Sequence, residues 1–252
     1  KDPTIKRHAN LLHHLLDLQR QIGDEAWRAT AREYIAAMSK SGAAPGAFAK
    51  LEIVYYYEHN IKEAIELSTK FLEKYPTHGL AAEASFIKGD CLRLSGDKKT
   101  ALSVFDALIS VYSESSGARF YVNAAVRQSA DILAESGRVK EAIKRLNRIV
   151  ATNPTAQALK LDHIGRLYAG AEDWKEAARA FQREARIHGA SIDTVCQALY
   201  NAGDCYYRMG DTASARGCLL RIIDRAPDSS WCRKARGTLF VWDEMTGGPD
   251  PT

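Results

Sequence analysis

The chain has 252 residues, of which 46% are hydrophobic and 26% are charged. This composition is ordinary for a soluble folded protein and excludes a chain that is mainly disordered. The 35 basic and 31 acidic residues give a net charge of +4 with no block of five or more like charges, so nucleic acid is not an expected partner.

The apolar stretches are too short to cross a bilayer. Residues 53–57 and 238–242 are among the most apolar, and both fall far below the roughly 20 residues that a spanning helix needs. We therefore expect no direct membrane insertion. The chain begins with Lys1 and has no apolar segment typical of a signal peptide near it, so we expect a processed form or a piece of a longer protein.

Residues 1–42 predict a helical hairpin. Residues 5–21 and 25–38 both have the apolar spacing of amphipathic helices, and Gly23-Asp24 lies between them as a turn. We interpret this hairpin as a degenerate repeat that caps the array after it.

Residues 43–228 predict five further helical hairpins. In four of the hairpins the first helix carries a small residue, and in all five the second helix carries an alanine, so that the two helices can approach closely. The small residues on the first helices are Gly89, Ala130, Gly165 and Gly203. The alanines on the second helices are Ala64, Ala101, Ala142, Ala177 and Ala215. The first hairpin departs from the pattern, because Glu52 stands where its small residue belongs.

Turn and stop signals divide these hairpins. Gly96-Asp97 and Gly210-Asp211 predict tight turns in which the aspartate caps the second helix. Pro76, Pro154 and Pro227 are predicted to end second helices, because proline cannot continue the hydrogen-bond ladder. After the last hairpin, residues 229–246 predict a C-terminal capping helix and residues 247–252 a disordered tail.

The repeat resembles the tetratricopeptide signature. The clearest copy reads Leu199, Ala202, Gly203, Tyr206, Gly210, Asp211, Ala215, Leu219, Ile222 and Pro227. The resemblance implies an all-α fold, a right-handed α-α superhelix of helical hairpins with capping helices.

Two junctions carry a more restricted resemblance. Residues 71–77 and 109–115 are similar to the junctions of bacterial cell-envelope tetratricopeptide proteins of the outer-membrane assembly lipoprotein and Tol-Pal coordinator types. This resemblance implies a periplasmic location. The five cysteines form no CxxC pair and are odd in number, which indicates buried thiols and favours the cytoplasm. Both compartments stay open.

The tetratricopeptide resemblance also implies a concave groove lined by the first helix of each hairpin. Aromatic and arginine side chains dominate binding energy at protein interfaces, so the expected ligand is a polypeptide segment. The alternative for each charged residue is a solvated ion pair with no ligand. The predicted lining is Lys50, Tyr56, Tyr57, Phe86, Asp90, Arg93, Arg127, Asp131, Asp162, Arg166, Tyr200, Asp204, Tyr207 and Arg208.

No residue pattern predicts catalysis, a cofactor or a metal. Adjacent His13 and His14 point to different sides of a helix, and the other histidines lack metal spacing. Cys91 and Cys205 recur at one repeat position, which indicates packing. We expect a protein-interaction scaffold and no enzyme. The alternative is a structural or assembly module of a larger complex without its own ligand, and self-association is left open.

Overall fold

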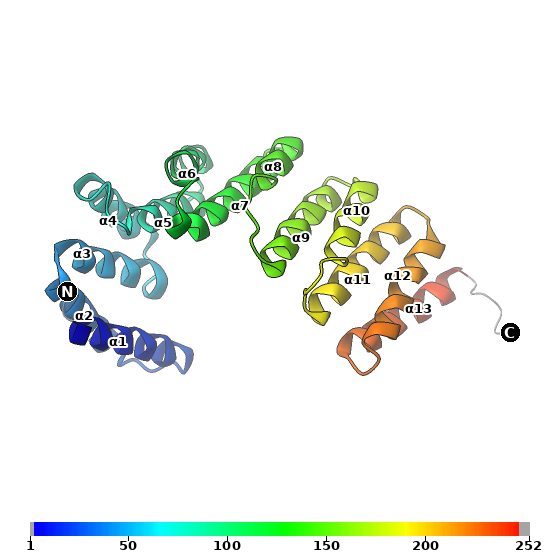
Figure 1. Cartoon of the computed structure of the whole chain (residues 1–252), viewed down its shortest axis with the longest axis horizontal. Coiled ribbons are helices and arrows are strands. Elements are labelled where there is room, and N and C mark those ends of the chain that lie inside the picture. The colour runs from blue at the N-terminus through cyan, green and yellow to red at the C-terminus, as the bar shows by residue number, and fades with distance from the viewer. Residues whose placement is uncertain (1–2, 247–252) are drawn as a thin grey trace. The chain divides into compact units, whose positions relative to one another are not determined.

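The computed structural model describes residues 3–246 of the chain. These residues form thirteen α-helices, one π-helix and one 3-10 helix (Figure 1), and no β-strand occurs among them, so the all-α prediction is confirmed. The predicted disordered tail at 247–252 lies outside the described residues. The helices are α1 Pro3–Gln21, α2 Trp27–Ser41, α3 Ala43–Glu52, η1 Ile53–Tyr57, α4 Ile61–Lys74, α5 Ala81–Leu94, α6 Lys98–Tyr112, η2 Ser116–Ala118, α7 Arg119–Glu135, α8 Val139–Leu146, α9 Pro154–Gly170, α10 Trp174–Glu184, α11 Ile192–Arg208, α12 Thr212–Arg225 and α13 Ser230–Thr246.

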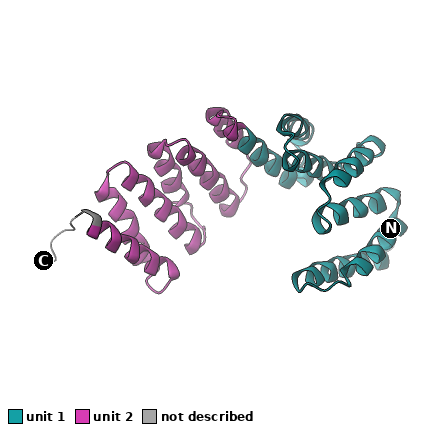
Figure 2. Cartoon of the chain, turned by 180° about the vertical axis from the view of Figure 1, so that it is seen from behind, with its two compact units in different colours: residues 1–132 teal, residues 133–252 magenta. Residues whose placement is uncertain are grey.

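The chain divides into two compact units, residues 1–132 and residues 133–252 (Figure 2). In the first unit, α1 packs on α2, α2 on α3, α4 on α5, and α5 on α6. In the second unit, α9 packs on α10, α10 on α11, α11 on α12, and α12 on α13. Helices that are neighbours in the chain are therefore neighbours in space, as in a series of hairpins.

The predicted aspartate caps are present. The Asp97 side chain accepts a hydrogen bond from the Thr100 backbone N–H at 3.1 Å, and Asp211 accepts one from Ser214 at 3.0 Å. These hydrogen bonds lower the pKa of both carboxyl groups, because they stabilise the ionised form. Gly210, directly before the second cap, has a φ of +78°, a backbone conformation that favours glycine.

One of the three proline predictions is wrong. Pro76 and Pro227 follow the ends of α4 and α12 as expected, but Pro154 is the first residue of α9, and α8 has already ended at Leu146. Proline suits this first helical position, because the N–H that it lacks would have no partner inside the helix. The Asn153 side chain caps the same end and accepts a hydrogen bond from Ala156 at 2.8 Å.

The small residues lie at the helix crossings, but two glycines meet a different partner from the one expected. The five alanines of the second helices are fully buried. A Cβ atom added at Gly89 or Gly165 would lie 2.5 Å from the Phe105 ring or 2.6 Å from the Phe181 ring. The repeat pattern predicts the opposite alanine as the partner of each glycine. The glycine instead makes room for a buried aromatic ring four residues further along the second helix, because the ring extends past the alanine.

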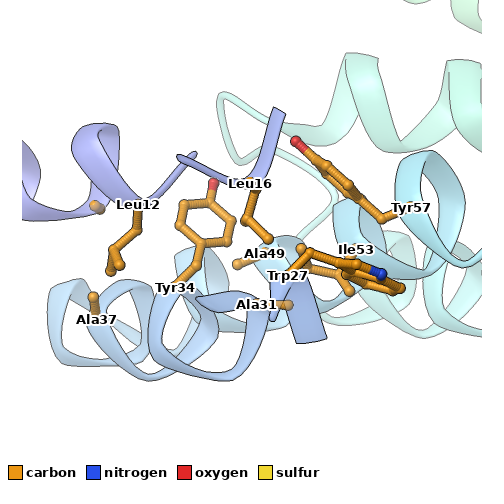
Figure 3. Close-up of a cluster of buried hydrophobic side chains, with 10 residues drawn as sticks. Leu12, Leu16, Trp27, Ala31, Tyr34, Ala37, Ala49, Ile53 and Tyr57 are labelled. Atoms are coloured by element: carbon orange, nitrogen blue, oxygen red, sulfur yellow. The ribbon is translucent and has the colours of Figure 1, made fainter. Parts of the chain in front are cut away.

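The first hairpin is joined to the next by one buried cluster (Figure 3). Burying a large apolar side chain contributes about 1.5–3 kcal/mol, so a cluster of this size holds α1, α2, α3 and η1 together. Its members are Ala9, Leu12, Leu16, Trp27, Ala31, Tyr34, Ala37, Ala49, Ile53 and Tyr57.

A matched pair of substitutions tests the packing of the phenylalanine rings against the glycines of the first helices. We expect Gly165→Ala to lower the free energy of unfolding by about 1–3 kcal/mol, because the new methyl group overlaps the buried Phe181 ring. Gly203→Ala, at the same repeat position, is the control, since its nearest contacts, the carbonyl oxygen of Ala215 and the Cβ of Cys218, lie at 3.4 Å. Urea unfolding of both variants gives the comparison. Equal stability of the two variants would contradict the proposed role of Gly165.

Candidate functional site

An open pocket of about 740 Å³ lies on the first unit. Four of its lining residues come from α1, one from α3, two from η1 and one from α5, so it forms where the first hairpin meets the two hairpins that follow. The lining residues are His13, Asp17, Arg20, Gln21, Glu52, Tyr56, Tyr57 and Glu83.

The π-helix η1 directs three consecutive tyrosines to three different places. The Tyr55 hydroxyl donates a hydrogen bond to buried Asp90 at 2.6 Å, and the Tyr57 hydroxyl donates one to Asp17 at 2.5 Å. Between them, Tyr56 is 45% exposed and lines the pocket. The wider turn is closed by a hydrogen bond of 3.0 Å from the Glu58 backbone N–H to the Ile53 carbonyl oxygen. Single π-turns of this kind are frequent at functional sites.

Each carboxylate of the pocket is paired with a tyrosine hydroxyl. Tyr57 donates to Asp17, and Tyr34 on α2 donates to Glu52 at 2.8 Å. The hydroxyl of Tyr121 on α7 hydrogen-bonds Glu83. These pairs join α1 to η1, α2 to α3 and α5 to α7. Asp17 and Glu52 are therefore held in fixed positions around the pocket, because each accepts a hydrogen bond from a side chain of another helix.

Acidic side chains outnumber basic ones in the pocket, although the whole chain has a net charge of +4. Three carboxylates line it together with one guanidinium, that of Arg20, and one imidazole, that of His13. Burial raises the pKa of Glu52 and the charge of Glu83 adds to the shift, so the pKa reaches about 7 although the Tyr34 hydrogen bond opposes the shift. Burial also raises the pKa of Glu83. Both carboxylates thus lack the solvent or cation that would best stabilise their charge.

Of the predicted groove residues in the first unit, Tyr56 and Tyr57 line the pocket. Asp90 and Arg93 instead form a partly buried ion pair at 2.7 Å, and Lys50 lies 3.5 Å from Glu63. The remaining three, Phe86, Arg127 and Asp131, are half-buried. The Phe86 ring packs 6.1 Å from the Phe105 ring and 6.2 Å from the Tyr121 ring. Burial lowers the pKa of Arg127, and the nearby charge of Asp131 opposes this shift.

The predicted groove residues of the second unit pair among themselves or contact α13. Asp162 pairs with Arg166, and the Arg208 Nε donates to Asp204 at 2.8 Å.

The two groove tyrosines of this unit contact the last helix. The Tyr200 hydroxyl lies 3.1 Å from the Thr238 hydroxyl, and the Tyr207 ring stacks on Trp242 with ring centroids 4.3 Å apart. Both contacts cover part of these predicted lining side chains.

Six residues of the pocket were absent from the predicted lining. They are His13, Asp17, Arg20, Gln21, Glu52 and Glu83. The sequence marks only one of these six residues, because Glu52 stands where the other repeats have a small residue. The α1 residues had no such signal, because only the packing of the first hairpin brings them to the pocket.

A second group of carboxyls is buried in the second unit. Glu184 is 3% exposed and Asp162 is 8% exposed. Glu184 Oε2 and Asp162 Oδ1 accept no hydrogen bond from any residue that the structure describes. Burial raises the pKa of Glu184 and the charge of Asp162 adds to the shift, so the pKa reaches about 8 although Arg166 opposes the shift. Glu184 therefore keeps its proton near neutral pH in the folded chain.

This proton makes stability depend on pH. The pKa of Glu184 rises on folding from a usual value of 4.5 to about 8, so the unfolded chain releases the proton first as pH rises. The free energy of unfolding should fall as pH rises from 4.5 to about 8. We expect Glu184→Gln to remove the loss and to be more stable than the wild type by about 1–3 kcal/mol near pH 9, because glutamine resembles the protonated acid.

Thermal unfolding between about pH 5 and pH 9 measures the effect. Glu172→Gln is the control, since Glu172 is exposed in the same unit. An advantage of Glu184→Gln that does not grow with pH would contradict the buried proton.

The cysteines are packing residues in the structure. All five are free and buried, which confirms the prediction of buried thiols. Burial raises the pKa of Cys91 to about 12 and that of Cys205 to about 11, so both thiols stay protonated and unreactive near neutral pH. Within residues 3–246, no three His, Cys, Asp or Glu side chains are placed to hold a metal ion, and no helix is both long and apolar enough to cross a membrane.

Two stretches of the chain match models of the tetratricopeptide repeat, residues 53–119 and residues 197–229. The first contains Tyr56, Tyr57 and Glu83 of the pocket. No curated protein matches the chain in sequence.

Solved structures share the fold at low sequence identity. PilW, a type IV pilus biogenesis factor, is 18% identical with a TM-score of 0.59, over 90% of this chain and 97% of that chain. The quorum sensor NprR from B. thuringiensis is 13% identical with a TM-score of 0.62, over 98% of this chain and 71% of that chain. MamA from Desulfovibrio magneticus RS-1 is 19% identical with a TM-score of 0.54, over 74% of this chain and 97% of that chain. These similarities show a tetratricopeptide-like fold.

Proposed function

We propose that this all-α helical repeat protein, which contains tetratricopeptide repeats, is an interaction scaffold whose pocket on the first unit binds a segment of another polypeptide. Tetratricopeptide repeats are typical of non-catalytic scaffolds that bind other proteins. The observation that carries the proposal is the open pocket itself, which joins an exposed aromatic ring to fixed polar groups. Ligand sites in proteins combine these features.

The position of Tyr56 suits it to be the main contact. Its ring is 45% exposed, whereas Tyr57, beside it in the chain, is buried and held by Asp17. An exposed tyrosine at the centre of a concave site contributes much of the binding energy at many protein interfaces, because its large flat ring loses little conformational freedom on binding. The surrounding hydrogen-bonded pairs keep the walls of the pocket in place.

The second candidate function is that of an assembly module in a larger complex, and the outer face of α1 favours it. Leu11, Leu15 and Leu18 on α1 and Ile22 directly after it recur at helical spacing and are all exposed, with Ile22 at 69% and Leu11 at 63%. A neighbouring helix could cover such a stripe. The bacterial cell-envelope likeness of residues 71–77 and 109–115 is compatible with this candidate.

Peptide selection on the immobilised chain tests the main proposal. A phage-displayed library of random peptides of about 12 residues should give binders that lose about tenfold or more affinity for Tyr56→Ala, because the largest exposed ring of the pocket is gone. Val111→Ala is the control, since Val111 is 71% exposed on α6 of the same unit and lies outside the pocket lining. Binders that respond equally to both changes would contradict a peptide site in the pocket.

The size of the chain in solution tests the second candidate. If the α1 stripe mediates assembly with a second copy, light scattering should show a dimer that dissociates when Leu11 and Leu18 are replaced by glutamine, because exposed apolar area drives the association. A monomer at all concentrations would count against self-assembly through α1, without affecting the pocket.

A further inference from the structure

We propose that the group bound in the pocket is a lysine or arginine side chain of the partner polypeptide, held by Asp17, Glu52 and Glu83 beside the ring of Tyr56. The inference rests on the proposed function and names the chemistry of the ligand. It is argued from the charge of the pocket, the fixed position of its acceptors and its exposed aromatic ring.

The charge balance of the pocket favours a cation. Three acidic side chains line it against one guanidinium and one imidazole, in a chain whose net charge is +4, and the imidazole Nδ1 of His13 lies 3.6 Å from Asp17 Oδ2. That guanidinium, on Arg20, lies 5.2 Å from the centre of the Trp27 ring and so already has an aromatic partner. An acidic segment would meet like charges, and an apolar one would remove water from carboxylates without replacing it. A basic side chain is attracted to the carboxylates and neutralises their charge.

The acceptors are arranged before any ligand arrives. A tyrosine hydroxyl from another helix holds two of the three carboxylates, at 2.5 Å for Asp17 and 2.8 Å for Glu52. Only Oε2 of Glu52 takes part in its hydrogen bond, and Oε1 accepts none from the residues that the structure describes. Acceptors that are already oriented lose little freedom on binding, so more of the charge attraction appears as affinity.

The Tyr56 ring adds a second contact for a cation. Lysine and arginine side chains bind over aromatic rings, and their apolar stems pack against the same surface. The chain uses this contact elsewhere, since Lys234 Nζ lies 4.0 Å from the centre of the Tyr200 ring, and the guanidinium of Arg208 lies 4.8 Å from that of the Trp174 ring. A long basic side chain can reach the carboxylates while its stem covers Tyr56.

Affinity should depend on pH in a direction set by Glu52. The groups around its carboxyl are Tyr34 on α2, Tyr56 on η1 and Glu83 on α5, with His13 and Arg20 of α1 in the same pocket. Because the pKa of Glu52 is raised to about 7, Glu52 gains a proton as pH falls below that value. A bound cation then loses a counter-charge, so binding weakens on acidification and strengthens above neutrality.

The test uses the full chain, the same random-peptide library, and single peptides from the bound pool made with acetylated and amidated ends. We expect the pool to be enriched in lysine and arginine. Above neutral pH, Glu52→Gln with Glu83→Gln should weaken binding of such a peptide by about 10- to 100-fold, because two counter-charges are lost while the side-chain shape is kept. Replacing the basic residue of the peptide by norleucine should have a similar effect.

A matched double variant controls for total charge. Glu66→Gln with Glu73→Gln removes the same number of charges from exposed positions on α4 of the same unit and should leave binding unchanged. Thermal unfolding of both double variants shows whether each is folded. If the norleucine peptide binds the wild-type chain with unchanged affinity, the inference is overturned.

The remaining outcomes separate the inference from the proposed function. Two outcomes would overturn the proposed basic ligand and keep the peptide site. In the first, the peptides depend on Tyr56 without an excess of basic residues in the pool. In the second, they bind the double variant Glu52→Gln with Glu83→Gln with unchanged affinity. A library that yields no peptide sensitive to Tyr56→Ala would overturn both proposals.

Discussion

Close packing at the helix crossings is the constraint on which the rest of the structure depends. A glycine or alanine at each crossing leaves room for the side chains of the facing helix, such as the Phe181 ring against Gly165. Dense packing of this kind determines how far apart and at what angle two helices lie. Because consecutive hairpins stack on one another, each crossing also positions the side chains of the next first helix.

The pocket arises where this packing rule is broken. Glu52 replaces the small residue of its hairpin, and its carboxyl accepts a hydrogen bond from Tyr34 of the first hairpin. The helix then widens into the π-turn of η1, which sends Tyr57 back toward α1 and leaves Tyr56 exposed. The contact between α3 and α4 stays apolar around Phe48, Leu51 and Ala64, while Glu52 adds a polar contact between α3 and α2. Buried polar groups that cost stability are common at functional sites.

Buried carboxyls occur in both units but in different surroundings. Glu52 and Glu83 line an open pocket and hydrogen-bond tyrosine hydroxyls, so a cation could reach them. Glu184 is enclosed and has an oxygen without a hydrogen bond among the described residues, so a proton is the simplest way to remove its charge. Exposure therefore decides whether a raised carboxyl pKa points to a ligand or to a buried proton.

The sequence by itself determined the helices, their turns and the small residues at the crossings, because these depend on neighbours within a few residues of the chain. It placed the helix caps at Asp97 and Asp211 and pointed to Tyr56 as a contact residue. The Asn153 cap before Pro154 was also a local signal that a helix begins there, whereas only the tertiary structure decided that Asp17 meets Tyr57, 40 residues away. Such contacts follow from how the hairpins stack. The repeat pattern does not show which charged residues the stacking brings together.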